Sequence, residues 1–212
     1  VVDNTFATPI NQNPGRLGAD LVLHSATKFI CGHNDALGGV ACGSRELVGR
    51  IYRYRELTGS ALDPFSAYLL IRSLKTLALR VQRQNENALE IAAYLAQHPA
   101  VEQVYYPGLV SHSGHEVAAK QMRGYGGVLS FDLKGGENAM RAVLPRLRYA
   151  YMAANLGQVE TIVGPPSATS HVECTVEERA AAGIPEGLIR YAVGIEDVQD
   201  LKADLENAFR AL

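Results

Sequence analysis

A lysine that follows two hydroxyl side chains is the residue of this chain best suited to do chemistry. Lys28 closes a segment in which the apolar run Leu21-Val22-Leu23 leads through Ser25 and Thr27. Asp3 lies upstream, at the end of another short apolar run. A lysine amine forms a Schiff base with an aldehyde, and a remote carboxylate keeps the pyridine nitrogen of pyridoxal 5′-phosphate (PLP) protonated, so that the ring accepts electrons. These residue types therefore suit PLP chemistry.

Two other interpretations of Ser25-Ala26-Thr27-Lys28 stay open at this point. A lysine that follows a strand can be a solvated loop residue. Ser-x-x-Lys is also the nucleophile motif of penicillin-binding proteins and some β-lactamases, with the serine attacking. That motif requires a later Lys-Thr-Gly on a strand. Here the Lys75-Thr76 pair continues to Leu77 within a predicted helix, and there is no Ser-Asp-Asn.

The bulk composition excludes several classes of function. The chain has 212 residues, of which 47% are hydrophobic and 20% charged, with a formal net charge of −2. This is the composition of a globular protein, and the charge disfavours nucleic acid or a membrane surface as partner. No apolar run approaches the ~20 residues of a membrane span. Three widely spaced cysteines, Cys31, Cys42 and Cys174, favour reduced thiols and a cytoplasmic location.

The elements that position Lys28 are predicted to be short strands followed by helices. The strands are expected at residues 1–5, 19–24 and 39–43, with a loop at 11–18 and a helix at 44–54. Because a natural domain seldom begins inside a core strand, we expect that residues preceding Val1 are missing, cleaved or on another chain. Asp63-Pro64 begins a helix, since aspartate caps helices and proline fits their first position. No glycine or proline occurs between Phe65 and His98, which predicts a break in a long helix and a domain boundary near 78–86.

The second part of the chain predicts a mixed sheet. Alternating apolar residues predict strands at 101–105, 127–133, 158–163 and 188–193, with helices at 137–147 and near the C-terminus. Thr175 to Glu178 forms a capping box that opens a short helix ending at Gly183. This order predicts an α+β domain, at residues 81–212, whose sheet is covered on one side. Residues 1–80 form the other predicted unit.

A resemblance to a known family joins these motifs. The sequence resembles the Cys/Met-metabolism PLP-dependent enzymes, which include cystathionine γ-synthases, cystathionine γ- and β-lyases, methionine γ-lyases and O-acylhomoserine sulfhydrylases. The likeness runs from one end of the chain to the other, through Asp3-Asn4-Thr5-Phe6-Ala7-Thr8-Pro9, His24-Ser25-Ala26-Thr27-Lys28, Gly32-His33-Asn34-Asp35, Arg72-Ser73-Leu74-Lys75-Thr76-Leu77, Tyr106-Pro107-Gly108-Leu109, Gly126-Gly127-Val128-Leu129-Ser130-Phe131 and Val193-Gly194-Ile195-Glu196-Asp197.

The resemblance implies an α/β architecture, the PLP-dependent transferase fold type I, which is aspartate aminotransferase-like. Residues 1–80 would be the C-terminal part of the PLP-binding large domain, and residues 81–212 the small C-terminal domain. The N-terminal half of such enzymes supplies a phosphate-binding loop and an aromatic residue stacked on the cofactor. A neighbouring subunit supplies a tyrosine and an arginine. The implied enzyme is therefore a homo-oligomer, a tetramer built as a dimer of dimers, that needs this N-terminal half.

The resemblance also implies roles for six residues. Lys28 would hold PLP and, once released, move protons between substrate carbons. Asp3 would pair with the pyridinium nitrogen, and Ser25 and Thr27 would donate hydrogen bonds to the cofactor phosphate. Arg190 would bind the substrate α-carboxylate, for which a planar guanidinium is suited. Asn155 stands where the family usually has serine, so it would bind substrate but reshape the pocket.

These features lead us to expect γ-elimination from a sulfur amino acid of the methionine or homocysteine type. Cystathionine-using members often have glutamate where Ala154 stands, so the alanine disfavours cystathionine as the preferred substrate. Arg55 to Gly59 resembles a stretch of methionine γ-lyases. The alternatives are γ-replacement on O-acylhomoserine and cystathionine cleavage. A non-catalytic remnant of the fold is the hypothesis from a different class. No metal site is predicted, because His112 and His115 lack accompanying ligands.

Overall fold

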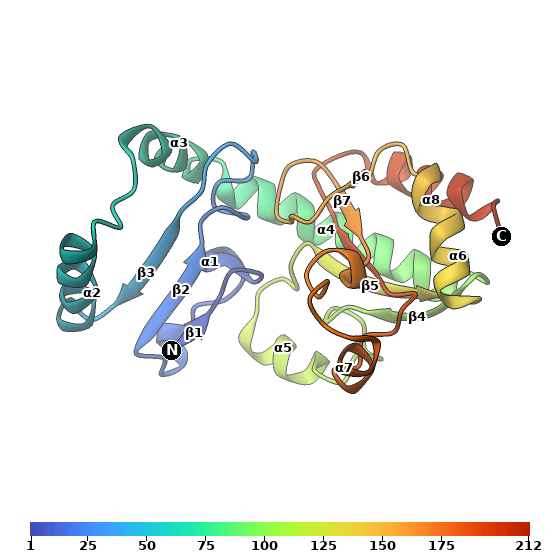
Figure 1. The fold of residues 1–212 in the computed structure, drawn as a ribbon, viewed down its shortest axis with the longest axis horizontal. Helices are drawn as coiled ribbons and strands as arrows, with labels where there is room; N and C mark the ends of the chain where they lie inside the picture. The colour runs from blue at the N-terminus through green and yellow to red at the C-terminus, as the bar shows by residue number, and fades with distance from the viewer.

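The computed structural model describes all 212 residues and contains two β-sheets connected by one long helix (Figure 1). The first sheet has three strands in the order β1-β2-β3. β1 runs parallel to β2, with Asp3 beside Leu23, whereas β3 is antiparallel to β2. The strands are β1 (Val2–Asp3), β2 (Leu21–Ser25) and β3 (Gly39–Gly43). The strands predicted at 19–24 and 39–43 are present, and that at 1–5 is shorter.

Helices with well-defined N-terminal caps follow this sheet. The side chain of Ser44 accepts a hydrogen bond from Leu47 N at 3.2 Å, and that of Asp63 accepts one from Ser66 N at 2.9 Å. Each cap satisfies a backbone donor that the helix itself leaves free. The elements are α1 (Thr8–Asn11), a 3₁₀ turn η1 (Pro14–Leu17) within the predicted loop, α2 (Arg45–Thr58), α3 (Pro64–Leu74) and α4 (Leu77–Gln97).

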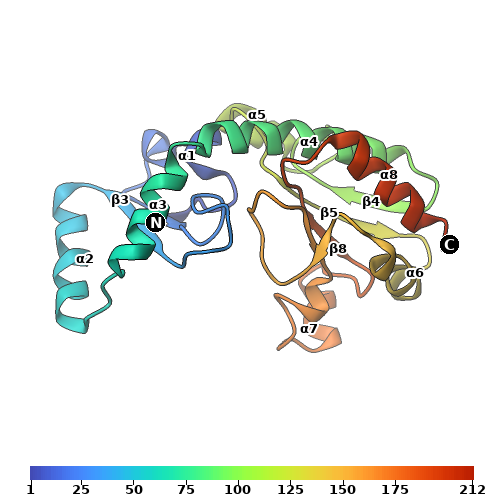
Figure 2. The same ribbon diagram turned by 90° about the horizontal axis from the view of Figure 1, so that it is seen from above.

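The long segment without glycine or proline is broken, as expected, but earlier than the range in which a boundary was predicted. The break lies at Lys75 and Thr76, where Lys75 N and Thr76 N bond back to Arg72 O and Ser73 O. α4 then runs without interruption through residues 78–86. In Figure 2 it extends from near α1 along the second sheet, over β4 and β5. The division at residue 80 therefore falls inside a continuous helix and stays a prediction.

The second sheet has five strands in the order β4-β5-β8-β7-β6. Leu129, Phe131 and Leu133 point from β5 into a core shared with α4 and α8, and the ring centroids of Phe131 and Phe209 lie 6.4 Å apart. Ser130 and Arg190 pair across β5 and β8 on the alternate positions. The strands are β4 (Val101–Tyr105), β5 (Val128–Leu133), β6 (Tyr151–Met152), β7 (Ile162–Gly164) and β8 (Ile189–Ala192), and the helices are α5 (His115–Gln121), α6 (Gly136–Val143), α7 (Val176–Ala181) and α8 (Val198–Phe209).

Two predicted elements differ from the structure for identifiable reasons. The helix predicted at 137–147 ends as α6 and continues only as 3₁₀ turn η2 (Leu144–Arg146), because Pro145 has no N–H to donate. The strand predicted at 158–163 is reduced to β7. The backbone of residues 158–161 bonds instead to other segments, since Val159 N donates to Gly32 O and Thr161 N to the Glu196 carboxylate.

None of the helices is both long enough and apolar enough to cross a membrane.

Candidate active site

Lys28 lies in a tight turn that the end of β2 leads into. Ala26 N donates to Gly38 O at 2.8 Å, Cys31 N to Ala26 O at 2.8 Å, and Gly32 N to Lys28 O at 2.8 Å. Phe29, Ile30 and Cys31 are buried beneath the turn. The main chain on both sides of Lys28 is thus held by hydrogen bonds and by the core, while the lysine side chain is left half-buried.

The structure brings Lys28, Asn155 and Arg190 together from distant parts of the chain. Lys28 Nζ donates a hydrogen bond to Asn155 Oδ1. Arg190 Nη2 donates to Asn155 O at 3.1 Å. Arg190 Nε is buried and has no hydrogen-bond partner within the chain. A buried guanidinium donor without a partner is suited to receive an anionic group such as a carboxylate.

The loops that carry Lys28 and Asn155 are in direct contact. Gly157 has φ +84°, and a Cβ placed on it would lie 2.6 Å from the backbone nitrogen of Phe29. Only glycine permits this approach without displacement of one loop. The neighbour of Lys28 in the chain therefore touches the loop of Asn155, which explains why the two polar side chains meet.

Burial and a neighbouring cation both affect the Lys28 amine. Burial lowers the pKa of Lys28 from its ordinary value, and the positive charge of Arg190 lowers it further. Burial likewise lowers the pKa of Arg190, although an arginine stays protonated near neutral pH. The consequence is a lysine that reaches its neutral, nucleophilic form at a lower pH than a solvated lysine.

We expect the substitution Arg190→Gln to raise the pKa of Lys28. Removal of the adjacent positive charge favours the protonated amine, so that the neutral form is reached at higher pH. The pH dependence of Lys28 modification by an amine-directed reagent, read by mass spectrometry of its peptide, measures this shift. Arg146→Gln, at an exposed arginine elsewhere, is the control. An unchanged midpoint in Arg190→Gln would show that Arg190 does not act on the amine.

The carboxylate of Asp3, on strand β1 next to β2, is held in its ionised form. Its Oδ1 accepts hydrogen bonds from Thr5 Oγ1 at 2.6 Å and Thr5 N at 2.9 Å. These bonds, the side-chain one first, hold the pKa of Asp3 below its ordinary value. Thr5 Oγ1 also accepts from Ser25 N at 2.8 Å, so one hydroxyl joins the carboxylate of β1 to the end of β2.

Four of the predicted site residues line two separate cavities. Asp3 and Ser25 line a cavity of about 500 Å³ whose other wall includes Tyr52 and Arg55. Thr27 and Asn155 line a different cavity of about 650 Å³. The Thr27 hydroxyl accepts a hydrogen bond from Gly38 N at 3.1 Å and donates one to Gly38 O at 3.4 Å, whereas the Ser25 hydroxyl has no partner within the chain. The structure therefore clusters three of the six predicted residues and places the other three nearby along β1, β2 and the turn.

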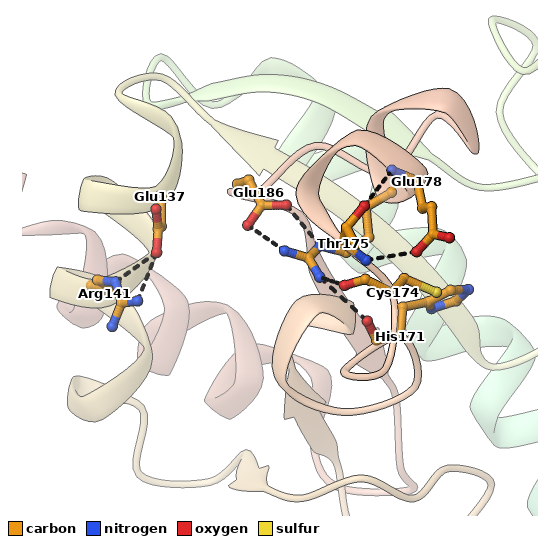
Figure 3. Close-up of polar contacts among 8 residues, drawn as sticks. Glu137, Arg141, His171, Cys174, Thr175, Glu178 and Glu186 are labelled. Atoms are coloured by element: carbon orange, nitrogen blue, oxygen red, sulfur yellow. Dashed lines mark hydrogen bonds and ion pairs between the residues drawn. The ribbon is translucent and has the colours of Figure 1, made fainter.

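The long connection between β7 and β8 leads into the strand that carries Arg190. Arg179 donates to Glu186 through Nε at 2.7 Å and Nη2 at 3.0 Å, and its Nη1 donates to the carbonyls of His171 and Cys174. Figure 3 shows these partners gathered around one point of the connection, with the predicted capping box of Thr175 and Glu178 beside them. Arg179 thus links separate parts of this connection by hydrogen bonds, shortly before β8 begins.

Sequence reasoning missed Thr5 and Asn34. Asn155 Nδ2 donates to Asn34 Oδ1 at 2.7 Å, and Asn34 has a left-handed backbone with φ +56°. Both residues lie in motifs that carry the family resemblance. Their residue types could have indicated a role, because threonine and asparagine near turns commonly hydrogen-bond to neighbouring groups.

Comparison with known proteins identifies the family. The family model of the Cys/Met metabolism PLP-dependent enzymes matches residues 1–210. The chain belongs to this family. It is 45% identical to L-methionine gamma-lyase of Fusobacterium nucleatum subsp. polymorphum, over all of this chain and 54% of that protein. It is 47% identical to chloroplastic cystathionine gamma-synthase 1 of Arabidopsis thaliana, over all of this chain and 38% of that protein.

A solved structure confirms the predicted fold class. Cystathionine gamma synthase of Xanthomonas oryzae pv. oryzae, solved with aminoacrylate and cysteine, matches with a TM-score of 0.96 and 45% identity, over 99% of this chain and 55% of that one. The chain spans about half the length of most of these relatives. As a Cys/Met metabolism PLP-dependent enzyme family member, it contains part of a fold type I PLP enzyme, as the sequence predicted.

The residues present fit the cofactor that this family uses. PLP presents an aldehyde, a pyridine nitrogen and a phosphate, which need an amine, a carboxylate and hydrogen-bond donors. Lys28 offers a desolvated amine of lowered pKa, and Asp3 an ionised carboxylate. The Ser25 hydroxyl is free of partners within the chain. The amine, the carboxylate and the hydroxyl therefore match the aldehyde, the pyridine nitrogen and the phosphate of the cofactor.

Proposed function

We propose that this chain forms part of a PLP-dependent enzyme that eliminates the γ-substituent of a sulfur amino acid of the methionine or homocysteine type. The observation that carries the proposal is the cluster of Lys28, Asn155 and Arg190. It places a lysine of lowered pKa beside an arginine whose buried Nε has no partner. PLP, when bound, supplies the electron sink that makes the bonds at the α-carbon labile.

Each protein group has a task within this proposal. Arg190 binds the α-carboxylate and fixes the orientation of the amino acid. The neutral amine of Lys28 takes the proton from Cα and returns protons to the neighbouring carbons. Asp3 keeps the pyridine nitrogen protonated, and Ser25 and Thr27 donate to the phosphate. Asn155 lies between the lysine and the arginine, so its carboxamide shapes the space that the substrate occupies.

Ala154 favours elimination from methionine or homocysteine over cleavage of cystathionine. Its side chain has no group that could bind the distal amino group of cystathionine, and no other residue of this loop contributes a carboxylate before Glu160. γ-Replacement on an O-acylhomoserine is the alternative, because it uses the same proton transfers and differs only in the fate of the γ-carbon.

One assay separates the two activities. Elimination converts methionine and water into 2-oxobutanoate, methanethiol and ammonia. Replacement converts O-acetylhomoserine and cysteine into a thioether and acetate. The complete natural protein, including any residues that precede Val1, is given each substrate with PLP, and the products are quantified. We expect 2-oxobutanoate from methionine. Thioether as the main product would favour replacement, whereas absence of both, with no PLP absorbance, would favour the non-catalytic alternative.

The proposal includes an assembly and a location. α2, which forms one wall of the cavity that Asp3 and Ser25 line, has no buried residue. We therefore infer that further protein, from the N-terminal half and from a second copy, completes the site in a homo-oligomer of the dimer-of-dimers type. The three cysteines form no disulfide, which supports a cytoplasmic location. Sedimentation of the complete protein measures the assembly.

A further inference from the structure

A stripe of buried polar side chains runs along one face of α4. Arg80, Gln84 and Asn87 are 5%, 0% and 1% exposed. Their spacing of four and three residues places them on the same face of the helix. Long polar side chains are seldom buried unless their hydrogen-bonding groups find partners. The partners of this stripe therefore indicate what it does.

Arg80 binds the backbone directly after Lys28. Its Nη1 donates to Phe29 O at 2.8 Å and its Nη2 to Ile30 O at 3.3 Å. The same guanidinium donates to Ser73 O at 3.1 Å and to Thr76 Oγ1 at 3.2 Å. Hydrogen bonds from a charged donor are stronger than neutral ones. Arg80 thus fastens the Lys28 turn to the start of α4.

Gln84 and Asn87 bind the segments that carry the other two members of the cluster. Gln84 Nε2 donates to Gln158 O at 2.7 Å, shortly after Asn155. Asn87 Nδ2 donates to Gly194 O at 3.1 Å and Glu196 O at 2.9 Å, just beyond the strand of Arg190. Three side chains on one face of a single helix therefore hold three segments that are far apart in sequence.

We propose that Arg80, Gln84 and Asn87 are positioning residues, which set the placement of Lys28 relative to Asn155 and Arg190. The inference rests on the proposed function, since it concerns the same site. α4 is a continuous helix across this stretch, so it acts as a rigid support. A shift of about 1 Å in a reacting group can reduce a rate roughly a hundredfold, which is the scale on which such a support matters.

The substitution Arg80→Met tests the first contact of the stripe. Methionine fills the space but leaves the carbonyls of Phe29 and Ile30 without their donor, so the turn loosens and water reaches the Lys28 amine. In cofactor-free protein we expect a higher pKa of Lys28, measured by the pH dependence of its chemical modification. With cofactor we expect roughly tenfold weaker PLP binding and a kcat lowered by roughly ten- to a hundredfold.

Arg83→Met is the matched control, because Arg83 lies on the exposed face of the same helix. Arg80→Lys keeps a positive charge but cannot reproduce the fork of donors, and we expect it to restore only part of the loss. If Arg80→Met fails to fold, judged by its melting curve, Arg80→Lys carries the test. A Lys28 pKa and PLP affinity equal to those of Arg83→Met, in whichever Arg80 variant folds, would overturn the proposal.

Gln84→Met tests the second contact separately. It leaves the buried Gln158 carbonyl without this donor but also removes a buried Oε1 that has no partner, so the two effects on stability partly offset each other. We expect weaker binding of L-methionine, followed by the change in cofactor absorbance, with the Lys28 pKa unchanged. Unchanged methionine affinity would contradict the role of Gln84. Failure of the proposed function would appear differently, as a wild-type protein without PLP or turnover, while the cofactor-free pKa comparison would still report on Arg80.

Discussion

Replacement of Lys28 by alanine is expected to lower the kcat of the complete protein by roughly a thousandfold or more. A positioned acid–base group contributes about 10²–10⁴-fold to a rate, and this residue is also proposed to hold the cofactor. The turn itself should survive, because the hydrogen bonds that hold it are made by backbone groups and by Arg80, not by the Lys28 side chain. Product formation from methionine measures the rate, and borohydride reduction followed by mass spectrometry measures covalent attachment of PLP.

Lys75→Ala is the control for this substitution. Lys75 is exposed at the break between α3 and α4, so its loss should change neither the rate nor the attachment of PLP. Added methylamine should restore part of the activity of Lys28→Ala, because it can supply a free amine as base. A Lys28→Ala protein that keeps its rate, or wild-type protein labelled on a different lysine, would show that Lys28 is not the reactive amine.

The substitution Asp3→Asn is expected to lower kcat by roughly a hundredfold while PLP remains attached to Lys28. Asparagine has nearly the shape of aspartate but no charge, so it cannot hold the pyridine nitrogen in its protonated form. A hydrogen bond to a charged group contributes about 1.5–3 kcal/mol, which sets the scale of the loss. Because the hydrogen bonds from Thr5 keep the pKa of Asp3 low, wild-type activity should not fall through titration of this group near neutral pH.

Two measurements distinguish loss of charge from loss of structure in Asp3→Asn. The absorbance of the bound cofactor should resemble that of wild type and should remain sensitive to borohydride. That result would show that PLP is still attached. Asp20→Asn, at an exposed aspartate just before β2, should leave kcat unchanged. If Asp3→Asn turned over substrate at the wild-type rate, the carboxylate would have no part in activating the cofactor.

Local patterns predicted the elements that depend on local interactions. The alternation at 101–105 and 127–133 corresponds to β4 and β5, and the apolar stripe near the C-terminus to α8. The capping box at Thr175 forms as predicted, since its partners are three residues apart. The prediction at 158–163 was too long, because that backbone bonds to Gly32, to Gln84 and to Glu196, all distant in sequence.

The residue types of the site were visible in the chain before any fold was known. Lys28, Asp3, Ser25, Thr27, Asn155 and Arg190 could be selected because their chemistry is specific and the motifs around them resemble one family. Their types alone left Lys28 open to several interpretations. Tertiary structure decided that Lys28 meets Asn155 and Arg190, and that burial lowers the pKa of its amine. It also showed that Arg80, Gln84 and Asn87 hold the three segments from a single helix. Such contacts join residues up to more than a hundred positions apart, and desolvation depends on everything packed around a group. Neither the long-range contacts nor the desolvation of a group is a property of a short stretch of sequence.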